Sequence, residues 1–379
     1  MVELLAMQLR EGVISVDWID DDEGLARLVA SFDSEIGVDT EFVRTNTFYA
    51  KIGLVQILSN SRVSLIDPQK VKNWVPFIDA LLSEELTKIM HASQEDLEIF
   101  REMFGVVPKN IFDCQLANAF LDSDFSISYS GLVSKRTGVT LEKSETRSDW
   151  LSRPLTVNQE KYAAEDVFYL LDLFSSLKED LRVSNKLGWF VEEMALRENP
   201  VEFSPENYYL RLKGTSNLTE RKLSYLQAAC HWREELARKL DLPRVRVASD
   251  SDLLELSRGE LLGLEEIAAV IRSRVARNSI KLLLSKLEGY KLRTPKVRPV
   301  SPLVSDDRKF LKRLQTFVHD KARTMSMAPE LLGRKRDLEQ CIRSFDQNGH
   351  LSEIFLGWRK KIVGNDFAGM LSDHFGHAA

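Results

Sequence analysis

The stretch Val38-Asp39-Thr40-Glu41-Phe42 determines how the first half of this 379-residue chain is interpreted. It precedes a second apolar run at residues 51–58, and both runs have the character of strands. Because alternate residues of a strand share a face, Asp39 and Glu41 point to the same side. Two neighbouring carboxylates repel each other, and a hard divalent cation removes the cost of desolvating them. The alternative is a half-exposed strand with two hydrated acids.

The surrounding segments predict a mixed sheet with helices on its faces. We expect strands at residues 36–43, 51–58, 63–66, 87–91 and 111–113, and helices at residues 74–82, 94–104, 115–121 and 158–177. The first three strands indicate an antiparallel meander, and the later strands alternate with helices. Residues 122–158 are rich in serine and charge and are expected to form a long irregular loop.

Two later motifs carry residues that could complete a metal site. Asp96 lies where a strand ends and a helix begins, and ligand sites collect there in α/β sheets. An acid in a first helical turn also has a purely structural explanation, because it interacts favourably with the helix dipole. Tyr162 and Asp166 are four residues apart and share one face of a predicted helix. A packed tyrosine and a hydrated acid are the alternative for this pair.

Taken together, these motifs resemble the DEDD superfamily of 3′→5′ exonucleases, in the branch whose last motif carries a tyrosine. The matching segments are Val38 to Phe42, His91 to Leu97 and Tyr162 to Asp166. Two further segments, Phe112-Asp113-Cys114-Gln115 and Lys143 to Leu155, look like ribonuclease D. The resemblance implies a ribonuclease H-like fold and a hydrolase that releases nucleoside 5′-monophosphates from RNA 3′ ends.

The resemblance also implies a role for each site residue. Asp39 would bridge two ions, Mg²⁺ or Mn²⁺. Glu41 and Asp166 would hold the ion that carries the attacking water, and Asp96 would help to position the second ion. Tyr162 would orient or deprotonate that water. Further candidates for substrate contact, which could instead pack or form ion pairs, are Phe42, His91, Lys143, Arg147 and Arg153.

Charge separates the two halves of the chain. Residues 1–200 carry 20 Lys and Arg against 34 Asp and Glu, a net charge of −14, and residues 201–379 carry 32 against 23, a net charge of +9. The basic half could attract a polyanion such as RNA, or the difference could be surface drift. The densest cationic stretch is expected on a helix and comprises Arg272, Arg274, Arg277 and Lys281. A second one comprises Lys309, Lys312, Arg313, Arg334, Lys335 and Arg336.

The basic half is predicted to form two helical blocks, separated by a proline-rich linker at residues 293–302. The blocks are weakly similar, since Leu226-Gln227 and His231 recur with the same spacing as Leu314-Gln315 and His319. The first block resembles a helicase-and-ribonuclease-D C-terminal (HRDC) domain and the second a diverged copy. HRDC domains usually bind nucleic acid or protein. The expected domains are an α/β exonuclease at residues 1–205 and all-α domains at residues 213–293 and 303–372.

Composition limits the setting and the function. No run of apolar residues is long enough to span a membrane, and the three cysteines show neither zinc spacing nor a disulfide framework. We therefore expect a cytoplasmic protein. The resemblance implies an exoribonuclease that trims transfer-RNA precursors and other small stable RNAs, and we expect it to be a monomer. One alternative is a single-stranded DNA exonuclease, because the metal chemistry needs no 2′-hydroxyl. Another is a catalytically silent RNA-binding scaffold, which would have no need of these acids.

Overall fold

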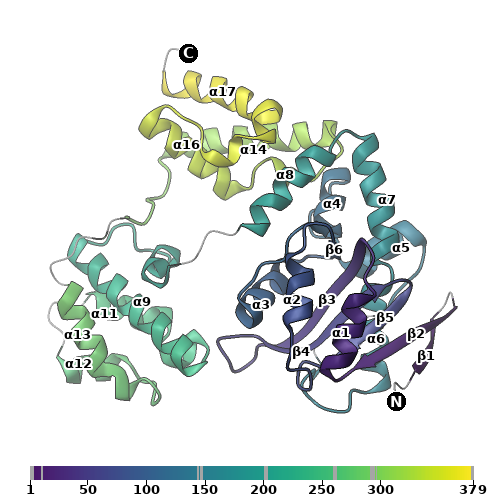
Figure 1. Ribbon diagram of the computed structural model, residues 1–379. Coiled ribbons are helices and arrows are strands. Elements are labelled where there is room, and N and C mark those ends of the chain that lie inside the picture. Colours follow the sequence, from purple (N-terminus) through teal and green to yellow (C-terminus); the bar gives the residue numbers. More distant parts are fainter. Residues whose placement is uncertain are drawn as a thin grey trace. The chain divides into compact units, whose positions relative to one another are not determined.

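The computed structural model describes residues 4–9, 12–142, 145, 148–199, 204–258, 263–290, 295 and 297–376 (Figure 1). Contacts between residues group the chain into two units. The first contains Met1–Val43, Ile52–Pro200 and Leu303–Ala379, and the second contains Arg44–Lys51 and Val201–Pro302. In the part of the chain that the structure describes, no helix is both long enough and apolar enough to cross a membrane.

A seven-stranded mixed sheet lies at the centre of the first unit, in the order β1-β2-β5-β4-β3-β6-β7. The strands are β1 (Leu4–Leu9), β2 (Gly12–Ile19), β3 (Glu35–Val43), β4 (Lys51–Ser59), β5 (Arg62–Ile66), β6 (Thr87–Met90) and β7 (Ile111–Asp113). Strand β4 pairs with β5 in antiparallel fashion, whereas β3 pairs with β6, and β6 with β7, in parallel. The predicted mixed sheet is confirmed. The antiparallel pair β1–β2 at its edge was not predicted.

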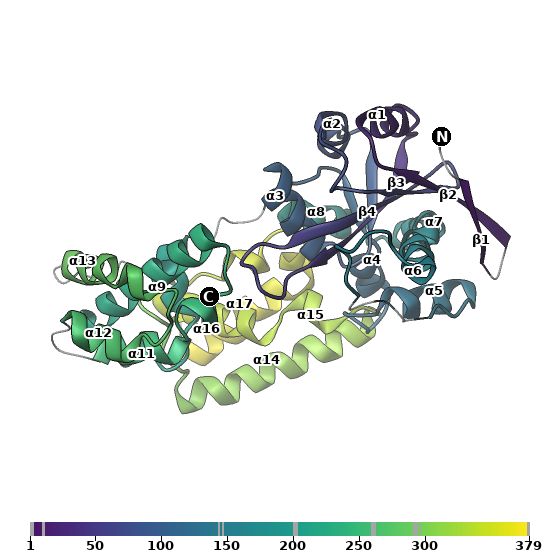
Figure 2. The ribbon, with the colours of Figure 1, turned by 90° about the horizontal axis from the view of Figure 1, so that it is seen from below.

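Helices cover both faces of this sheet. Figure 2 shows α1 and α2 on one side of the strands and α6 and α7 on the other. The helices are α1 (Asp22–Ala30), α2 (Val75–Leu82), α3 (Gln94–Phe104), α4 (Cys114–Leu121), α5 (Tyr129–Thr137), α6 (Val157–Phe168), α7 (Leu170–Val183) and α8 (Leu187–Glu198). This arrangement agrees with the α/β class predicted for the first half.

Two predictions for residues 122–177 were wrong. The expected single helix over 158–177 is two helices, α6 and α7, which meet at Tyr169. The backbone N–H of Tyr169 donates to the hydroxyl of Tyr129 at 3.1 Å, and that hydroxyl donates to the carbonyl of Glu165 at 3.0 Å. The side chain of Tyr129, which comes from a distant segment, therefore bonds to the backbone where α6 ends and α7 begins. Tyr129 itself belongs to α5, a helix inside the expected loop.

The C-terminal helices pack into the same hydrophobic core as the seven-stranded sheet. They include α14 (Ser305–Thr324), α15 (Pro329–Leu332), α16 (Lys335–Asn348) and α17 (Asn365–Phe375). The backbone N–H of Ala328 donates to the carbonyl of Ala119 at 2.7 Å. Trp189 of α8 stacks on Trp358, with ring centroids 5.5 Å apart. The sequence did not predict that residues 303–379 share one compact unit with the sheet.

The second unit has a helical core of its own. Its helices are α9 (Glu220–Leu240), α10 (Arg244–Val247), α11 (Asp250–Arg258), α12 (Leu264–Val270) and α13 (Ile280–Tyr290). The loop Arg44–Lys51 between β3 and β4 also belongs to this unit. Asp241 accepts hydrogen bonds from the backbone N–H groups of Phe48 and Tyr49, both at 3.0 Å. The guanidinium groups of Arg238 and Arg244 lie 4.7 and 4.6 Å from the centre of the Phe48 ring.

Candidate active site

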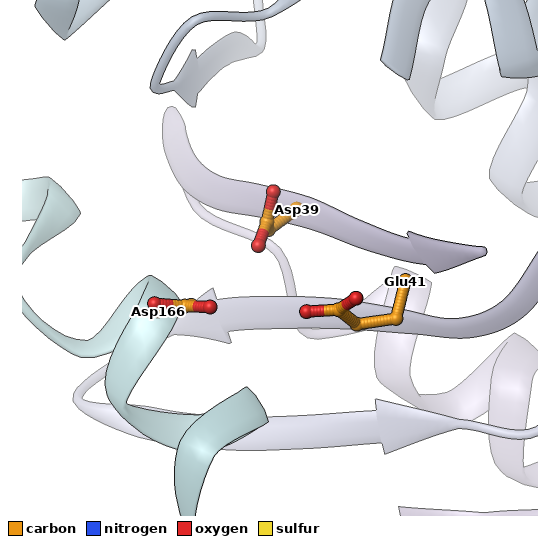
Figure 3. Close-up of side chains that lie close together, drawn as sticks. All are labelled: Asp39, Glu41 and Asp166. Atoms are coloured by element: carbon orange, nitrogen blue, oxygen red, sulfur yellow. The ribbon is translucent and has the colours of Figure 1, made fainter. Parts of the chain in front are cut away.

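Three carboxylates from two elements converge beside the sheet. One oxygen each of Asp39, Glu41 and Asp166 lies within 4.8 Å of the other two (Figure 3). Asp39 and Glu41 are on β3, as their alternation predicts, and Asp166 is on α6. Helix α6 can approach β3 because Ala163 and Ala164, both fully buried, present only methyl groups. A closely spaced set of carboxylate oxygens is the ligand type that hard divalent cations prefer.

Asp96 does not belong to this group of three but lies near it. Its side chain is buried and accepts a hydrogen bond from the hydroxyl of Thr40, with 2.5 Å between Oγ1 and Oδ1. The charge of Asp96 nevertheless contributes to the raised pKa of both Asp39 and Glu41. The structure thus brings all four predicted acids into one region. The bond between Thr40 and Asp96 was not predicted from the sequence. The position of Thr40 between two acids on a largely buried strand could have indicated a hydroxyl with a bonding role.

The electrostatics of the four acids indicate a site that needs positive charge. Burial is the main cause of the raised pKa of each of these four carboxyl groups. The pKa of Asp39 is raised well above its ordinary value. Burial and repulsion from Asp166 and Asp96 raise the pKa of Glu41 to about 9. Burial raises the pKa values of Asp96 and Asp166 to about 7, although hydrogen bonds from Thr40 and Tyr162 act in the opposite direction. A bound divalent cation would allow the carboxylates to ionise together.

A cavity of about 130 Å³ opens beside the acids. It is lined by Val38, Asp39, His91, Tyr129, Tyr162, Asp166 and Leu170. Tyr162 and Asp166 therefore face the same space, as their four-residue spacing predicts. The ring of His91 donates from Nε2 to the carbonyl of Ile127 at 3.1 Å. Burial lowers the pKa of His91, so the imidazole is neutral at pH 7.

The turn that carries His91 and Asp96 is held by a buried carboxylate. Asp113, at the end of β7, accepts from the backbone N–H groups of Ala92 and Ser93 at 3.2 and 3.1 Å, and from the Ser93 hydroxyl at 2.9 Å. The guanidinium of Arg197 pairs with the same carboxylate at 2.9 Å. Ala92 has a positive φ of 55°, a strained conformation for this residue type that these bonds stabilise. From the sequence, Asp113 was noted only as part of the segment Phe112 to Gln115 that resembles ribonuclease D, and its role in holding this turn was not predicted.

The substrate-contact candidates have different surroundings. Arg153 pairs with Asp67 at 2.8 Å and donates to the carbonyls of Gly53, Trp150 and Ser152. With its Nε bond to Asp67, all five of its N–H donors are used inside the protein, which favours the ion-pair alternative. Lys143 and Arg147 lie outside the described residues. Phe42 is half-buried on β3.

The cationic stretch of the second unit is exposed but does not lie on one helix as predicted. Arg272, Arg274 and Arg277 lie in the connection between α12 and α13, and only Lys281 is in an α-helix. Helix α12 ends at Val270, because the next residue, the fully buried Ile271, has an extended backbone conformation. The side chains therefore extend from a loop.

Comparisons with known proteins agree with this site. A family model described as a 3′-5′ exonuclease matches residues 16–182, which contain all four acids. Ribonuclease D of Pseudomonas paraeruginosa is 36% identical over 362 residues, which cover 92% of this chain and 96% of that protein. This chain belongs to the ribonuclease D family. As a ribonuclease D, it is a hydrolase with 3′→5′ exoribonuclease activity and a divalent-metal site.

One more relative and two solved structures extend the agreement over most of this ribonuclease D. Ribonuclease D of Escherichia coli is 32% identical over 372 residues, covering 94% of this chain and 98% of that protein. The crystal structure of E. coli RNase D, described as an exoribonuclease involved in structured RNA processing, has a TM-score of 0.85 at 31% identity and covers 94% of this chain and 98% of its own. The catalytic core of RRP6 from Trypanosoma brucei, with a TM-score of 0.59 and 24% identity, shares the fold.

Proposed function

We propose that this ribonuclease D holds two ions, Mg²⁺ or Mn²⁺, at Asp39, Glu41, Asp96 and Asp166. The observation that carries the proposal is the convergence of three carboxylates within 4.8 Å. Their pKa values are raised, and among the described residues no cation contributes to these shifts. Such ions activate a water and stabilise the leaving oxygen of a phosphodiester. The product of each cycle is a nucleoside 5′-monophosphate.

The chain's own residues position the reacting groups. Asp39 would contribute to holding both ions, and Glu41 and Asp166 would hold the ion that carries the attacking water. Thr40 fixes one oxygen of Asp96, so that the other oxygen keeps a defined direction. The hydroxyl of Tyr162, hydrogen-bonded to Asp166, orients the water. Orientation is the easier role for it, because an ordinary tyrosine has a pKa of about 10 and is a poor base at neutral pH.

The proposed substrates are transfer-RNA precursors and other structured small RNAs. Support comes from the description of the E. coli relative as an enzyme of structured RNA processing. It also comes from the exposed cations Arg272, Arg274, Arg277 and Lys281, which could bind phosphates away from the cleavage site. We assign residues 213–293 and 303–372 to HRDC-type domains on the basis of their sequence resemblance. We further propose a monomer that works in the cytoplasm, a setting that suits three buried, unpaired cysteines.

Digestion of end-labelled oligonucleotides tests the central proposal. With Mg²⁺ or Mn²⁺, a 5′-labelled RNA should give a descending ladder, and a 3′-labelled RNA should give labelled mononucleotide at once. A DNA strand of matched sequence measures the preference for ribose. Internal fragments that appear first would indicate an endonuclease, and no cleavage with any divalent metal would contradict the assignment of the acids.

A further inference from the structure

His91 is held in one orientation beside the metal-binding acids. Its Nε2 atom lies 3.1 Å from the carbonyl oxygen of Ile127, which also accepts from Nε2 of Gln115 at 3.0 Å. The edge of the imidazole meets the ring of Tyr129, with centroids 5.6 Å apart and an interplanar angle of 70°. A carbonyl oxygen can only accept, so Nε2 carries the hydrogen. In the neutral ring, Nδ1 is then an acceptor.

That acceptor is left without a partner. Nδ1 of His91 is buried, and none of the described residues forms a hydrogen bond with it. The side chain lines the same 130 Å³ cavity as Asp39, Tyr162 and Asp166. A buried polar atom without a partner is destabilising, so such an atom in a native protein needs an explanation, for example a catalytic role or a bound molecule that completes its bonding.

The hydroxyl groups that line the cavity are already engaged. The Tyr129 hydroxyl donates to the carbonyl of Glu165 and accepts from the backbone of Tyr169. The Tyr162 hydroxyl forms its hydrogen bond with Asp166. Neither hydroxyl is therefore the donor for Nδ1, and a molecule that enters the cavity could supply one.

The chemistry of RNA narrows the choice of donor. Phosphate oxygens only accept hydrogen bonds at neutral pH, and the donors on the bases differ among the four nucleotides. The ribose hydroxyls are the donors that every terminal nucleotide shares, and the 2′-hydroxyl is the group that distinguishes RNA from DNA. When the scissile phosphate lies at the acids, the terminal ribose is the adjacent sugar.

We propose that Nδ1 of His91 accepts a hydrogen bond from a hydroxyl of the terminal ribose, so that His91 is a specificity-determining residue for the 3′ nucleotide. This inference rests on the proposed function, because it places the terminal phosphodiester at the four acids. If the partner is the 2′-hydroxyl, His91 selects RNA over DNA at the residue being removed. If the partner is the 3′-hydroxyl, His91 selects a free 3′ end.

The test combines changes in the enzyme with changes in the substrate. One RNA is prepared with a terminal ribose, a terminal 2′-deoxyribose or a terminal 3′-deoxyribose, and single-turnover release of that nucleotide is measured at saturating metal. We expect one deoxy end to slow the wild-type enzyme by about tenfold, the usual scale for one missing hydrogen bond. The His91→Phe enzyme should release a terminal ribonucleotide about tenfold more slowly than the wild type. Its rate should not fall further when the end carries the deoxyribose that slowed the wild type.

Gln115→Met is the matched control. It removes the other hydrogen bond to the Ile127 carbonyl and leaves Nδ1 in place, so any loss should be equal for all three ends. The inference would be overturned if His91→Phe and the deoxy end each reduced the rate by an independent factor, so that their effects multiplied. Nδ1 would then contribute only to packing or to binding a water. In that case wild-type hydrolysis of the RNA would leave the proposed function standing. A wild-type enzyme that hydrolyses none of the three RNAs would overturn both.

A measurement on the wild-type protein alone makes the outcome independent of variant folding. Inhibition by AMP, 2′-deoxy-AMP and 3′-deoxy-AMP is compared in the presence of Mg²⁺. One of the deoxy compounds should inhibit about tenfold less strongly than AMP, and it should be the one whose sugar slowed the wild-type reaction. Equal inhibition constants for all three compounds would contradict the proposal.

Discussion

Thr40 donates a hydrogen bond to Asp96 from the middle of the strand that carries Asp39 and Glu41, with an Oγ1–Oδ1 distance of 2.5 Å. The two residues are 56 positions apart in the chain, and both are buried. One strand thus presents two acids on one face and anchors a third acid from its opposite face. In the proposed metal site, Thr40 would therefore orient Asp96 without being a ligand itself.

Replacement of Thr40 should reduce activity through Asp96. Thr40→Val keeps the shape of the side chain and removes the hydroxyl, so Asp96 loses the bond that orients it. We expect kcat to fall by about tenfold, on the scale of one lost hydrogen bond to a charged group, and half-saturation by Mg²⁺ to shift upward. Steady-state kinetics over a Mg²⁺ titration provides the measurement. Thr40→Ser should restore most of the activity, and a Thr40→Val enzyme with normal metal dependence would contradict this role.

Removal of a clustered charge should inactivate the enzyme and stabilise the metal-free protein. In Asp39→Asn a proposed metal ligand is lost, and we expect kcat to fall by at least about 10³-fold. In EDTA at pH 8.5 the same variant should melt at a higher temperature than the wild type, because it removes both the burial of a charge and the repulsion that together raise the pKa of Asp39. Asp172→Asn, an exposed acid on α7, is the control and should change neither property. A lower melting temperature for Asp39→Asn would argue against a repulsive cluster.

The stability of the metal-free protein should fall as pH rises. The folded pKa values of about 7 for Asp96 and Asp166 and about 9 for Glu41 exceed the unfolded values of about 4. Between these limits the folded state binds more protons than the unfolded state, so the free energy of unfolding decreases from pH 4 toward pH 9. Saturating Mg²⁺ should therefore raise the melting temperature more at pH 8.5 than at pH 5.5. Calorimetry with EDTA and with Mg²⁺ tests this, and an equal gain at both pH values would contradict it.

Arg153 should contribute to stability more than to substrate binding. Its guanidinium pairs with Asp67, and the two side chains are 19% and 3% exposed. Arg153→Met leaves the Asp67 carboxylate without its cation and should cost about 3 kcal/mol of unfolding free energy, as loss of one partner of a buried pair does. The KM for a short RNA, measured below the melting transition, should stay within about twofold of the wild-type value, since a packing residue contributes no uniform binding. A large rise in KM without loss of stability would instead indicate a phosphate contact.

The exposed cations of the second unit should control the salt dependence of RNA binding. Each phosphate that a protein neutralises on single-stranded RNA contributes about −0.7 to the slope of log affinity against log salt. Replacing Arg272, Arg274, Arg277 and Lys281 by Gln should therefore weaken binding to a transfer-RNA precursor and flatten that slope. The measurement uses an Asp39→Asn background, which prevents degradation. A matched set on α14, comprising Arg308, Lys309, Lys312 and Arg313, shows whether any four charges have the same effect.

The sequence predicted those parts of the site that depend on local spacing. The two-residue alternation of Asp39 and Glu41 and the four-residue spacing of Tyr162 and Asp166 follow directly from strand and helix geometry. The bond between Thr40 and Asp96 could not be predicted in this way, because it joins residues that only the folded sheet brings together. The free Nδ1 of His91 is likewise a property of the finished cavity.

The fold was predicted to a similar extent. Most strands and helices of the first half were expected from their apolar patterns, but the break at Tyr169 depends on the hydroxyl of Tyr129 from another helix. The position of α14 to α17 in the core of the first unit was also missed. Their helical pattern is local, whereas the surface on which they pack is formed by distant segments such as α4 and α8.

Both ends of the chain build the first unit, and this has a genetic consequence. The side chain of Lys186 donates to the carbonyls of Phe120, Met325 and Ser326, so one ammonium group ties the exonuclease helices to the segment after α14. A premature stop codon shortly after residue 302 would leave the four acids and the second unit intact in the coding sequence, yet it would expose the core that these late helices cover. Such nonsense alleles should behave as null alleles, even though the truncated product retains every residue of the metal site.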